Sequence, residues 1–392
     1  MPSRPARSLF VAIGVTVLAV VLMYLAATWG VAAFQQARAQ SSAGATALPT
    51  AVESAPPSVG TTEQYGPLGA LSMAYAGTNV EQGLLTDVEQ PWLAVSARTG
   101  TYRAISAPDL PAPQAGAVAM SKAGDRLAWA ADNSVQLYDP TTDETREVPV
   151  DGVSRVGAFS PDASMLTVYA DGLAVLDLAG GDVVAEAGGL EPDVLDTTAW
   201  QADGAAVDYV DGRDLVTLPV DAGDATTQAS PFQEPTSLAW SPSGEVLVAL
   251  EPDAEDVPRL RAASAGRGGD LGSARTVDTS GISLNRLLGF SGEDTVAVSA
   301  YLLESGSLER ILDVPLDSGS VVDMTTLPAE DGENWRDSTT LVVSGDALRA
   351  GSTDYGNRVW PWSYSARLGA CLLVGLFGLG LWLTRRRRSR RR

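Results

Sequence analysis

Histidine is absent from the sequence, and cysteine and lysine each occur once. Without histidine the chain cannot form a Ser-His-Asp triad, a Cys-His catalytic pair or a metal site built on imidazole. The single cysteine, Cys371, lies inside an apolar run, so it has no partner for an intramolecular disulfide and offers no thiolate to an aqueous site. These absences leave carboxylates as the main candidates for any catalysis.

Basic residues are scarce outside the two ends of the chain. The sequence has 48 Asp and Glu against 27 Lys and Arg, and nine of the arginines lie at residues 4, 7 and 385–392. The remainder therefore holds 18 basic residues against 48 acidic ones, a net charge of −30. A surface of this sign repels phosphate backbones, so we predict that the domain does not bind nucleic acid.

The first long uncharged run covers residues 9–34. Its 26 residues are enough to cross a bilayer as a helix at about 1.5 Å per residue. A cleaved signal peptide is the alternative, because Ala37-Arg38-Ala39 matches an A-x-A cleavage site, but the run is longer than the apolar core of a signal peptide. We therefore predict a transmembrane helix at 9–34, with residues 1–8 in the cytoplasm.

The second uncharged run covers residues 368–384 and is followed by seven arginines within 385–392. Arginine clusters of this kind mark the cytoplasmic side of a membrane helix, and the aromatic segment 357–367 in front of the run is typical of a membrane interface. We predict a second transmembrane helix at 368–384 and a cytoplasmic Arg-rich tail at 385–392. Both termini are then cytoplasmic, and the acidic middle of the chain is extracytoplasmic.

Residues 35–67 are rich in Ala, Ser, Thr, Pro and Gln and hold few large apolar side chains. Such a composition buries too little surface to offset its chain entropy. We predict a flexible linker here, which would hold the following domain away from the membrane.

From residue 68 to residue 356 the sequence is a series of short apolar runs separated by turns of Gly, Asp, Pro, Ser and Thr. No stretch keeps the spacing of an amphipathic helix, so the region is predicted to be all-β. An anchor residue, usually aromatic, followed by a polar turn recurs every 39 to 50 residues, close to the period of a four-stranded propeller blade. The anchors are Met120, Phe159, Trp200, Trp240, Phe290 and Trp335.

A four-stranded unit cannot bury both of its faces alone, whereas units stacked in a ring cover one another. We therefore predict an all-β propeller of six or seven blades, flanked by the two transmembrane helices. Residues 92–95 and 102–105 read as the last strands of an incomplete first blade, and residues 335–351 read as an incomplete last one. One end is expected to supply the strand that the other lacks. Two β-sandwiches are the alternative, which the 40-residue period disfavours.

Two of the turns carry a specific resemblance. Ala158-Phe159-Ser160-Pro161-Asp162 and Ala239-Trp240-Ser241-Pro242-Ser243-Gly244, at this period, resemble the TolB-like and WD40-like propeller repeats of bacterial envelope proteins. The likeness covers about 280 residues and implies the fold rather than an activity, because propellers include enzymes, receptors and scaffolds. The Trp-Asp and Gly-His dipeptides of eukaryotic WD40 blades are absent, so the partners of that family are not carried over.

Few residues are candidates for chemistry. A Ser-Lys dyad could use only Ser121 and Lys122, which lie in a blade turn and are interpreted as solvated turn residues. The acidic clusters at 251–256 and 330–333 could hold calcium, but neither has the spacing of a known calcium loop, so they are interpreted as solvated loop charge. No catalytic, cofactor-binding or metal-binding residue is predicted, and no cofactor.

These observations favour a non-enzymatic binding or scaffold module, held at the cell membrane by two helices. Its expected partners are membrane lipid, through those helices, and an envelope protein or polymer. Two alternatives stay open: a carboxylate-dependent hydrolase or lyase acting on envelope glycans, and a ligand-sensing subunit of a membrane complex.

Overall fold

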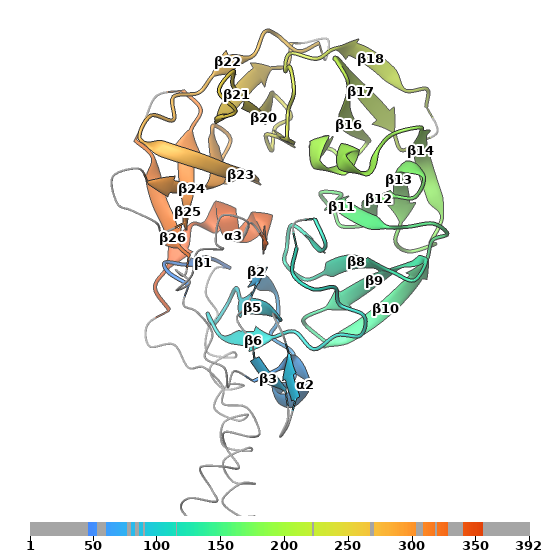
Figure 1. Cartoon of the computed structure of the whole chain (residues 1–392), viewed down its shortest axis with the longest axis vertical. Helices are drawn as coiled ribbons and strands as arrows, with labels where there is room; N and C mark the ends of the chain where they lie inside the picture. Colours follow the sequence, from blue (N-terminus) through green and yellow to red (C-terminus); the bar gives the residue numbers. More distant parts are fainter. Residues whose placement is uncertain are drawn as a thin grey trace, which may run out of the picture.

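The repeat units fold into six four-stranded antiparallel sheets that stand around a central axis (Figure 1). The computed structural model describes residues 46–52, 60–76, 80–82, 86–88, 91–114, 116–221, 223–266, 270–302, 309–317, 320–327 and 340–355. The structure is thus a six-bladed β-propeller, which confirms the propeller and resolves the blade number. It rules out the two-sandwich alternative.

In each blade the inner strand lies next to the axis, and the other three strands follow outward in the order named below. Blade 1 is β27 (Leu341–Val343), β2 (Leu71–Ala76), β5 (Trp92–Ser96) and β6 (Tyr102–Ala104). Blade 2 is β7 (Ala119–Met120), β8 (Leu127–Ala131), β9 (Ser134–Asp139) and β10 (Glu144–Pro149). Blade 3 is β11 (Arg155–Phe159), β12 (Met165–Tyr169), β13 (Gly172–Asp177) and β14 (Val183–Gly188). Blade 4 is β15 (Thr198–Trp200), β16 (Ala206–Asp211), β17 (Asp214–Pro219) and β18 (Thr226–Ala229).

Blade 5 is β19 (Ser237–Trp240), β20 (Val246–Pro252), β21 (Pro258–Ser264) and β22 (Arg275–Thr276). Blade 6 is β23 (Ile282–Phe290), β24 (Thr295–Leu302), β25 (Glu309–Pro315) and β26 (Val322–Thr326). The remaining elements are β1 (Leu48–Pro49), β3 (Val80–Gln82), β4 (Thr86–Val88), β28 (Ser352–Thr353), α2 (Thr62–Tyr65), the 3-10 helix η1 (Pro192–Thr197) and α3 (Gly345–Ala350).

The turns explain why the strands stop where they do. Between β8 and β9, Asp132 and Asn133 both have positive φ angles, 43° and 63°, as a two-residue type I′ hairpin requires. At the other end of the blade, Gly124 has φ 70°, and a Cβ there would come within 1.9 Å of the Leu71 carbonyl oxygen. Glycine at this turn therefore lets blade 1 approach blade 2.

Apolar side chains gather between neighbouring blades, one cluster for each of the six seams. The anchors contribute as expected, since Phe159, Trp200 and Phe290 are all buried at these seams. The cluster between blades 4 and 5 is the smallest, with seven buried residues against nine between blades 3 and 4. That seam is therefore the least apolar part of the described ring.

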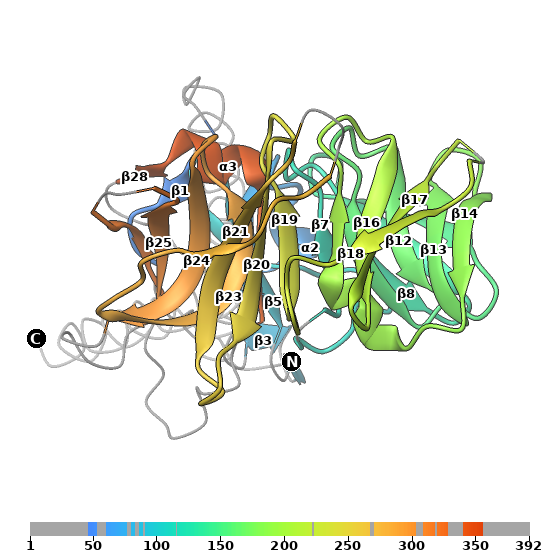
Figure 2. The ribbon, with the colours of Figure 1, turned by 90° about the horizontal axis from the view of Figure 1, so that it is seen from above.

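Both ends of the described chain close the ring. The C-terminal strand β27 pairs with β2 and becomes the inner strand of blade 1, with Met73 opposite Val343. This confirms the predicted closure, although residues 341–343 complete the first blade rather than a separate last one. Beside this strand, α3 and the parallel pair of β1 and β28 lie together at one side of the ring (Figure 2).

The prediction of a flexible linker at 35–67 is wrong for two parts of that range, residues 46–52 and 60–67, which belong to the propeller. Leu48 is fully buried, and the Val52 N–H donates to the Thr326 carbonyl of blade 6 at 2.7 Å. The Tyr355 hydroxyl donates to the carbonyls of Ala47 and Ala97 at 2.9 and 2.6 Å. A polar, Thr- and Ala-rich segment is thus ordered by backbone pairing to blades 6 and 1, which its composition does not reveal.

The segments predicted to contact the membrane, 1–8, 9–34, 357–367, 368–384 and 385–392, lie outside the described residues. Within the described ranges, no helix is both long and apolar enough to cross a membrane.

Candidate functional site

The polar turn that follows each anchor is a structural device. The Ser160 hydroxyl accepts the Met165 N–H at 2.9 Å and donates to Asp162 at 2.7 Å. The pKa of the Asp162 carboxyl group is lowered by the Ser164 N–H, which donates to it at 3.0 Å, and by the hydroxyls of Ser160 and Ser164. In blade 5 the Ser241 hydroxyl accepts the Val246 N–H at 3.0 Å. The turn therefore fixes the end of the inner strand relative to the start of the next strand.

A cavity of about 470 Å³ lies where the inner strands converge. It is lined from β11, β19 and β23, from η1 and from the segment that leads into β7. The residue four positions before each of five anchors contributes to this lining. These five residues, which we call the axial ring, are Gly116, Arg155, Asp196, Thr236 and Arg286.

Two members of the axial ring form an ion pair. Arg155 donates to Asp196 at 3.0 Å and to the Pro192 carbonyl at 2.9 Å, and it thereby joins blade 3 to the segment leading into blade 4. Gly116 makes room for this guanidinium group, since a Cβ at Gly116 would lie 2.6 Å from an Arg155 nitrogen. The pair is partly solvated, with side-chain exposures of 28% and 51%, so it contributes polarity more than stability.

The third charged member, Arg286, lies deeper in the wall and donates to the Leu341 carbonyl of blade 1 at 2.8 Å. Burial lowers its pKa, while the charges of Asp196 and Glu309 act in the opposite direction. Glu309 accepts the Asn285 amide at 2.8 Å, and burial raises its pKa. The axial cavity is therefore lined by two arginines and one carboxylate, a polar lining suited to recognising a polar ligand.

The candidate Ser-Lys pair is part of a turn. The buried Ser121 hydroxyl donates to Asp125 at 2.7 Å and accepts the Arg126 N–H at 3.0 Å. The Lys122 carbonyl accepts the Ser344 hydroxyl at 2.8 Å, next to the strand that closes the ring. The interpretation as solvated turn residues is therefore wrong for Ser121, which is buried and bonded within the turn, while Lys122 takes part in ring closure through its carbonyl.

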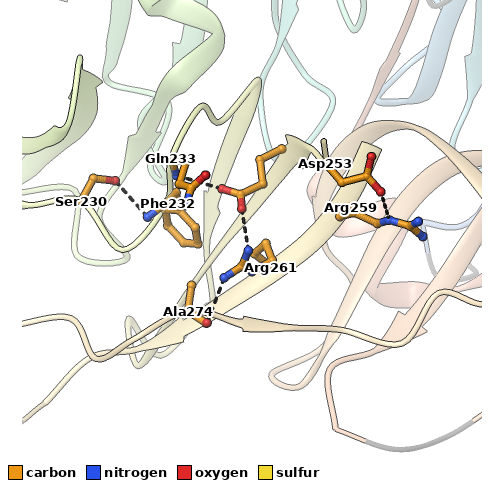
Figure 3. Close-up of polar contacts among 8 residues, drawn as sticks. Ser230, Phe232, Gln233, Asp253, Arg259, Arg261 and Ala274 are labelled. Carbon is orange, nitrogen blue, oxygen red and sulfur yellow. Dashed lines mark hydrogen bonds and ion pairs between the residues drawn. The ribbon is translucent and has the colours of Figure 1, made fainter. Parts of the chain in front are cut away.

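Two acids of the cluster at 251–256 form ion pairs with arginines of the same hairpin, one of which is Asp253 with Arg259 (Figure 3). Glu251 accepts Arg261 at 2.8 Å and also the Gln233 N–H at 3.1 Å, so it ties the segment between blades 4 and 5 to β20. Asp253 accepts Arg259 at 2.9 Å and two backbone N–H groups of its own turn, and these hydrogen bonds lower its pKa. The prediction of solvated loop charge holds for Asp253 but is wrong for Glu251, which is buried.

Within the described part of the chain, no group of three or more His, Cys, Asp or Glu side chains is placed to hold a metal ion. The second acidic cluster, residues 330–333, lies outside that part, as does the anchor Trp335.

Sequence reasoning missed the axial ring, although the signal was present. When the repeats are aligned on their anchors, the residue four positions before each anchor is small, polar or charged. Side chains at even spacing along a strand share a face, so an inward apolar side chain would ordinarily be expected at this position. Reading that single column through the repeats would have identified Arg155, Asp196 and Arg286 together.

No protein-family model matches the sequence, and the search of curated proteins gave no match. Solved structures similar to this chain include hydrazine synthase of Kuenenia stuttgartiensis, with 17% identity and a TM-score of 0.42 over 56% of this chain and 67% of that one. TolB of Acinetobacter baumannii has 14% identity and a TM-score of 0.39 over 65% and 69%. The β-propeller domain of Cps50 (Swd1) from Myceliophteria thermophila has 16% identity and a TM-score of 0.43 over 65% and 90%. The fold assignment rests on the strand pairing of this chain itself.

Proposed function

We propose that this protein is a non-catalytic binding module that recognises an envelope protein or polymer through the axial cavity of its propeller. The observation that carries the proposal is the axial ring. Arg155, Asp196 and Arg286 come from different blades, yet they line one cavity at the same register of the repeat. The same position of the repeat thus carries side chains of different charge in different blades. Such variation is expected of a recognition surface rather than of a structural core.

The charges in the cavity favour binding over hydrolysis. Among the described residues that line it, Asp196 is the only carboxylate, and it is ion-paired with Arg155. Glycoside hydrolysis ordinarily needs two carboxyl groups across a cleft. The proposal therefore retains binding as the function and does not extend to the glycan-cleaving alternative.

The proposed location is the outer side of the cell membrane, with anchors at 9–34 and 368–384 and both termini in the cytoplasm. The length of those apolar runs and the arginines at 385–392 support this orientation. Protease treatment of intact cells is expected to cleave the acidic propeller region. A propeller that stays intact until the cells are lysed would contradict the orientation.

The binding role is tested by filling the cavity. Ala158 is exposed and lines it, so Ala158→Trp is expected to block access while leaving the blade seams unchanged. Ala229→Trp, on the exposed outer strand β18, is the matched control. The full-length chain is purified in mild detergent after cross-linking in cells, and a partner is expected with the wild type and the control but not with Ala158→Trp. Recovery of the wild type alone, or an equal yield of partner with Ala158→Trp, would overturn the proposal.

A further inference from the structure

Arginine side chains bridge most seams between blades. At four of the six seams, a guanidinium group donates across to a backbone carbonyl at 2.6 to 2.9 Å. The pairs are Arg126 with Ala163, Arg146 with Leu178, Arg155 with Pro192, Arg275 with Leu316 and Arg286 with Leu341. Among the described residues, no arginine bridges blades 4 and 5 in this way.

The seam between blades 4 and 5 holds a buried carboxylate instead. Asp208 lies on β16 and is 1% exposed. It accepts the Trp240 indole N–H from blade 5 at 2.7 Å, the Thr217 hydroxyl, and the Gln201 amide at 3.1 and 3.3 Å. All three donors are neutral, and burial raises the pKa of Asp208 while these hydrogen bonds oppose the shift. The Asp208 carboxylate is thus hydrogen-bonded, but none of these three partners is a cation.

The propeller does not need a carboxylate at this position. Aligned on the anchors, the residue equivalent to Asp208 is Ala128 in blade 2, Thr167 in blade 3, Val248 in blade 5 and Ala297 in blade 6. The serine of the turn is also replaced in blade 4, by Gln201, which reaches Asp208. Two departures from the repeat therefore meet at one point.

A pocket of about 280 Å³ opens at the same point. Its lining includes Asp208, Trp240 and Gln201, with the exposed carboxylate of Asp203 and the amide of Gln228 nearer the solvent. Among the described residues that line it, none carries a positive charge. The pocket is small, so it fits the head of a side chain or of a small molecule rather than a polymer.

We propose that this seam pocket binds an organic cation, the primary ammonium or guanidinium group of a ligand or partner side chain, against Asp208 and Trp240. Such a group would donate N–H bonds to carboxylate oxygens, and it would bring to this seam a cation such as the arginines supply at four of the others. The weakest of the present bonds, that of Gln201, is the one that a ligand would displace. The proposal does not depend on the axial cavity.

The test follows the indole N–H of Trp240 in the full-length chain, kept in mild detergent and labelled with ¹⁵N-tryptophan. The signal is assigned by its loss in Trp240→Phe. The probe is n-butylammonium chloride, with sodium chloride and n-butanol as controls for ionic strength and for apolar contact. We expect a saturable shift of the Trp240 signal with n-butylammonium only.

Three variants decide the result. Asp208→Asn should weaken n-butylammonium binding about tenfold or more, and Asp224→Asn, an exposed acid of the same blade that does not line the pocket, should leave it unchanged. Ala202→Arg keeps Asp208 and places a guanidinium at the rim, so it should block the probe even if Asp208→Asn folds poorly. The other tryptophan signals report the fold of each variant.

The proposal is overturned by any of four outcomes. These are no saturable shift with n-butylammonium, an equal shift with sodium chloride, undiminished binding in both Asp208→Asn and Ala202→Arg, and a larger response to calcium chloride than to the organic cation. The last outcome would identify an inorganic cation site.

Discussion

The two seams on either side of blade 4 are built from the same repeat but are closed differently. In each, a tryptophan anchor reaches back to the preceding blade through its indole N–H. Trp200 donates to the Ala158 carbonyl at 2.9 Å, whereas Trp240 donates to the Asp208 carboxylate at 2.7 Å. At the position of Asp208, blade 3 has Thr167, whose hydroxyl bonds to its own inner strand through the Ala158 N–H at 2.8 Å.

This difference indicates which of the two seams can accommodate a binding site. The seam between blades 3 and 4 satisfies its polar groups internally, and Trp200 is 8% exposed in an apolar cluster. The seam between blades 4 and 5 has a smaller apolar cluster, a pocket and a charge whose hydrogen-bond donors are all neutral. The first of these seams is closed by packing, whereas the second carries polar groups that do not serve packing.

Replacing each tryptophan by alanine should distinguish the two seams most clearly in the free energy of unfolding. Trp200→Ala is expected to lower the free energy of unfolding by about 3–5 kcal/mol, because it leaves a large cavity in a packed seam. Trp240→Ala should cost about half as much, since Trp240 is only partly buried and already borders a pocket. Urea denaturation followed by circular dichroism measures both. Equal costs, or a larger cost for Trp240→Ala, would mean that the two seams are packed alike.

The connection between blades 4 and 5 should depend on the buried ion pair of blade 5. Arg261→Ala leaves Glu251, whose side chain is 6% exposed, without its cation. We expect a loss of about 2 kcal/mol, less than for a fully buried pair because Arg261 is 28% exposed. Arg259→Ala is the matched control. It should cost less than about 1 kcal/mol, because Arg259 and Asp253 are both more exposed than Arg261 and Glu251. Similar losses in the two variants would refute the role given to Glu251.

Removing only the indole N–H should reverse the order of the two seams. Replacing tryptophan by β-(3-benzothienyl)alanine does this at nearly constant volume, because sulfur takes the place of the N–H group. At position 240 the replacement takes a donor from a charged acceptor and should cost about 2 kcal/mol. At position 200 it takes a donor from a neutral carbonyl and should cost about 1 kcal/mol. The same urea measurement applies. A larger loss at position 200 would show that the Asp208 carboxylate is not the stronger acceptor.

The pH dependence of stability should separate Asp208 from the other acids. Its folded pKa lies above the unfolded value of about 3.9, so the unfolded chain loses this proton more readily. As pH rises from below the unfolded pKa through the folded one, the wild type should therefore lose stability relative to Asp208→Asn. Asp224→Asn, measured over the same range, controls for surface charge. A relative stability that is flat, or that rises with pH, would contradict the burial of an unpaired charge.

The sequence predicted the blades because their strands and turns are local. The apolar runs, the polar turns and the anchors recur from unit to unit, so the period alone indicates a ring, and two incomplete ends indicate its closure. The placement of residues 46–52 could not be predicted in this way. Their order comes from backbone pairing with residues about 300 positions away, as Leu48 opposite Ser352 shows, and a Thr- and Ala-rich composition does not encode it.

The candidate sites depended on register. Arg155 and Arg286 could have been found from the sequence, since both stand four positions before an anchor. Asp208 could have been noticed as a charge in a column of Ala, Thr and Val. Its pocket could not, because that depends on how Trp240 of the next blade packs against it. Contacts between blades depend on how the ring is arranged in three dimensions, so they cannot be predicted from the repeat in the sequence.

Both proposed sites exist only if the C-terminal strand closes the ring, and one cross-link tests that directly. Met73 and Val343 are opposite each other, and the flanking bond from the Ser344 N–H to the Ser72 carbonyl makes theirs a non-hydrogen-bonded pair. Such a pair has Cα atoms about 4.5 Å apart, within the range of a disulfide. In a Cys371→Ser background, Met73→Cys with Val343→Cys is expected to form a disulfide under mild oxidation, seen as faster migration on a non-reducing gel. Met73→Cys with Val322→Cys, an exposed residue of blade 6, should not. Failure of the first pair to cross-link, or equal cross-linking of both, would contradict the closed six-bladed ring.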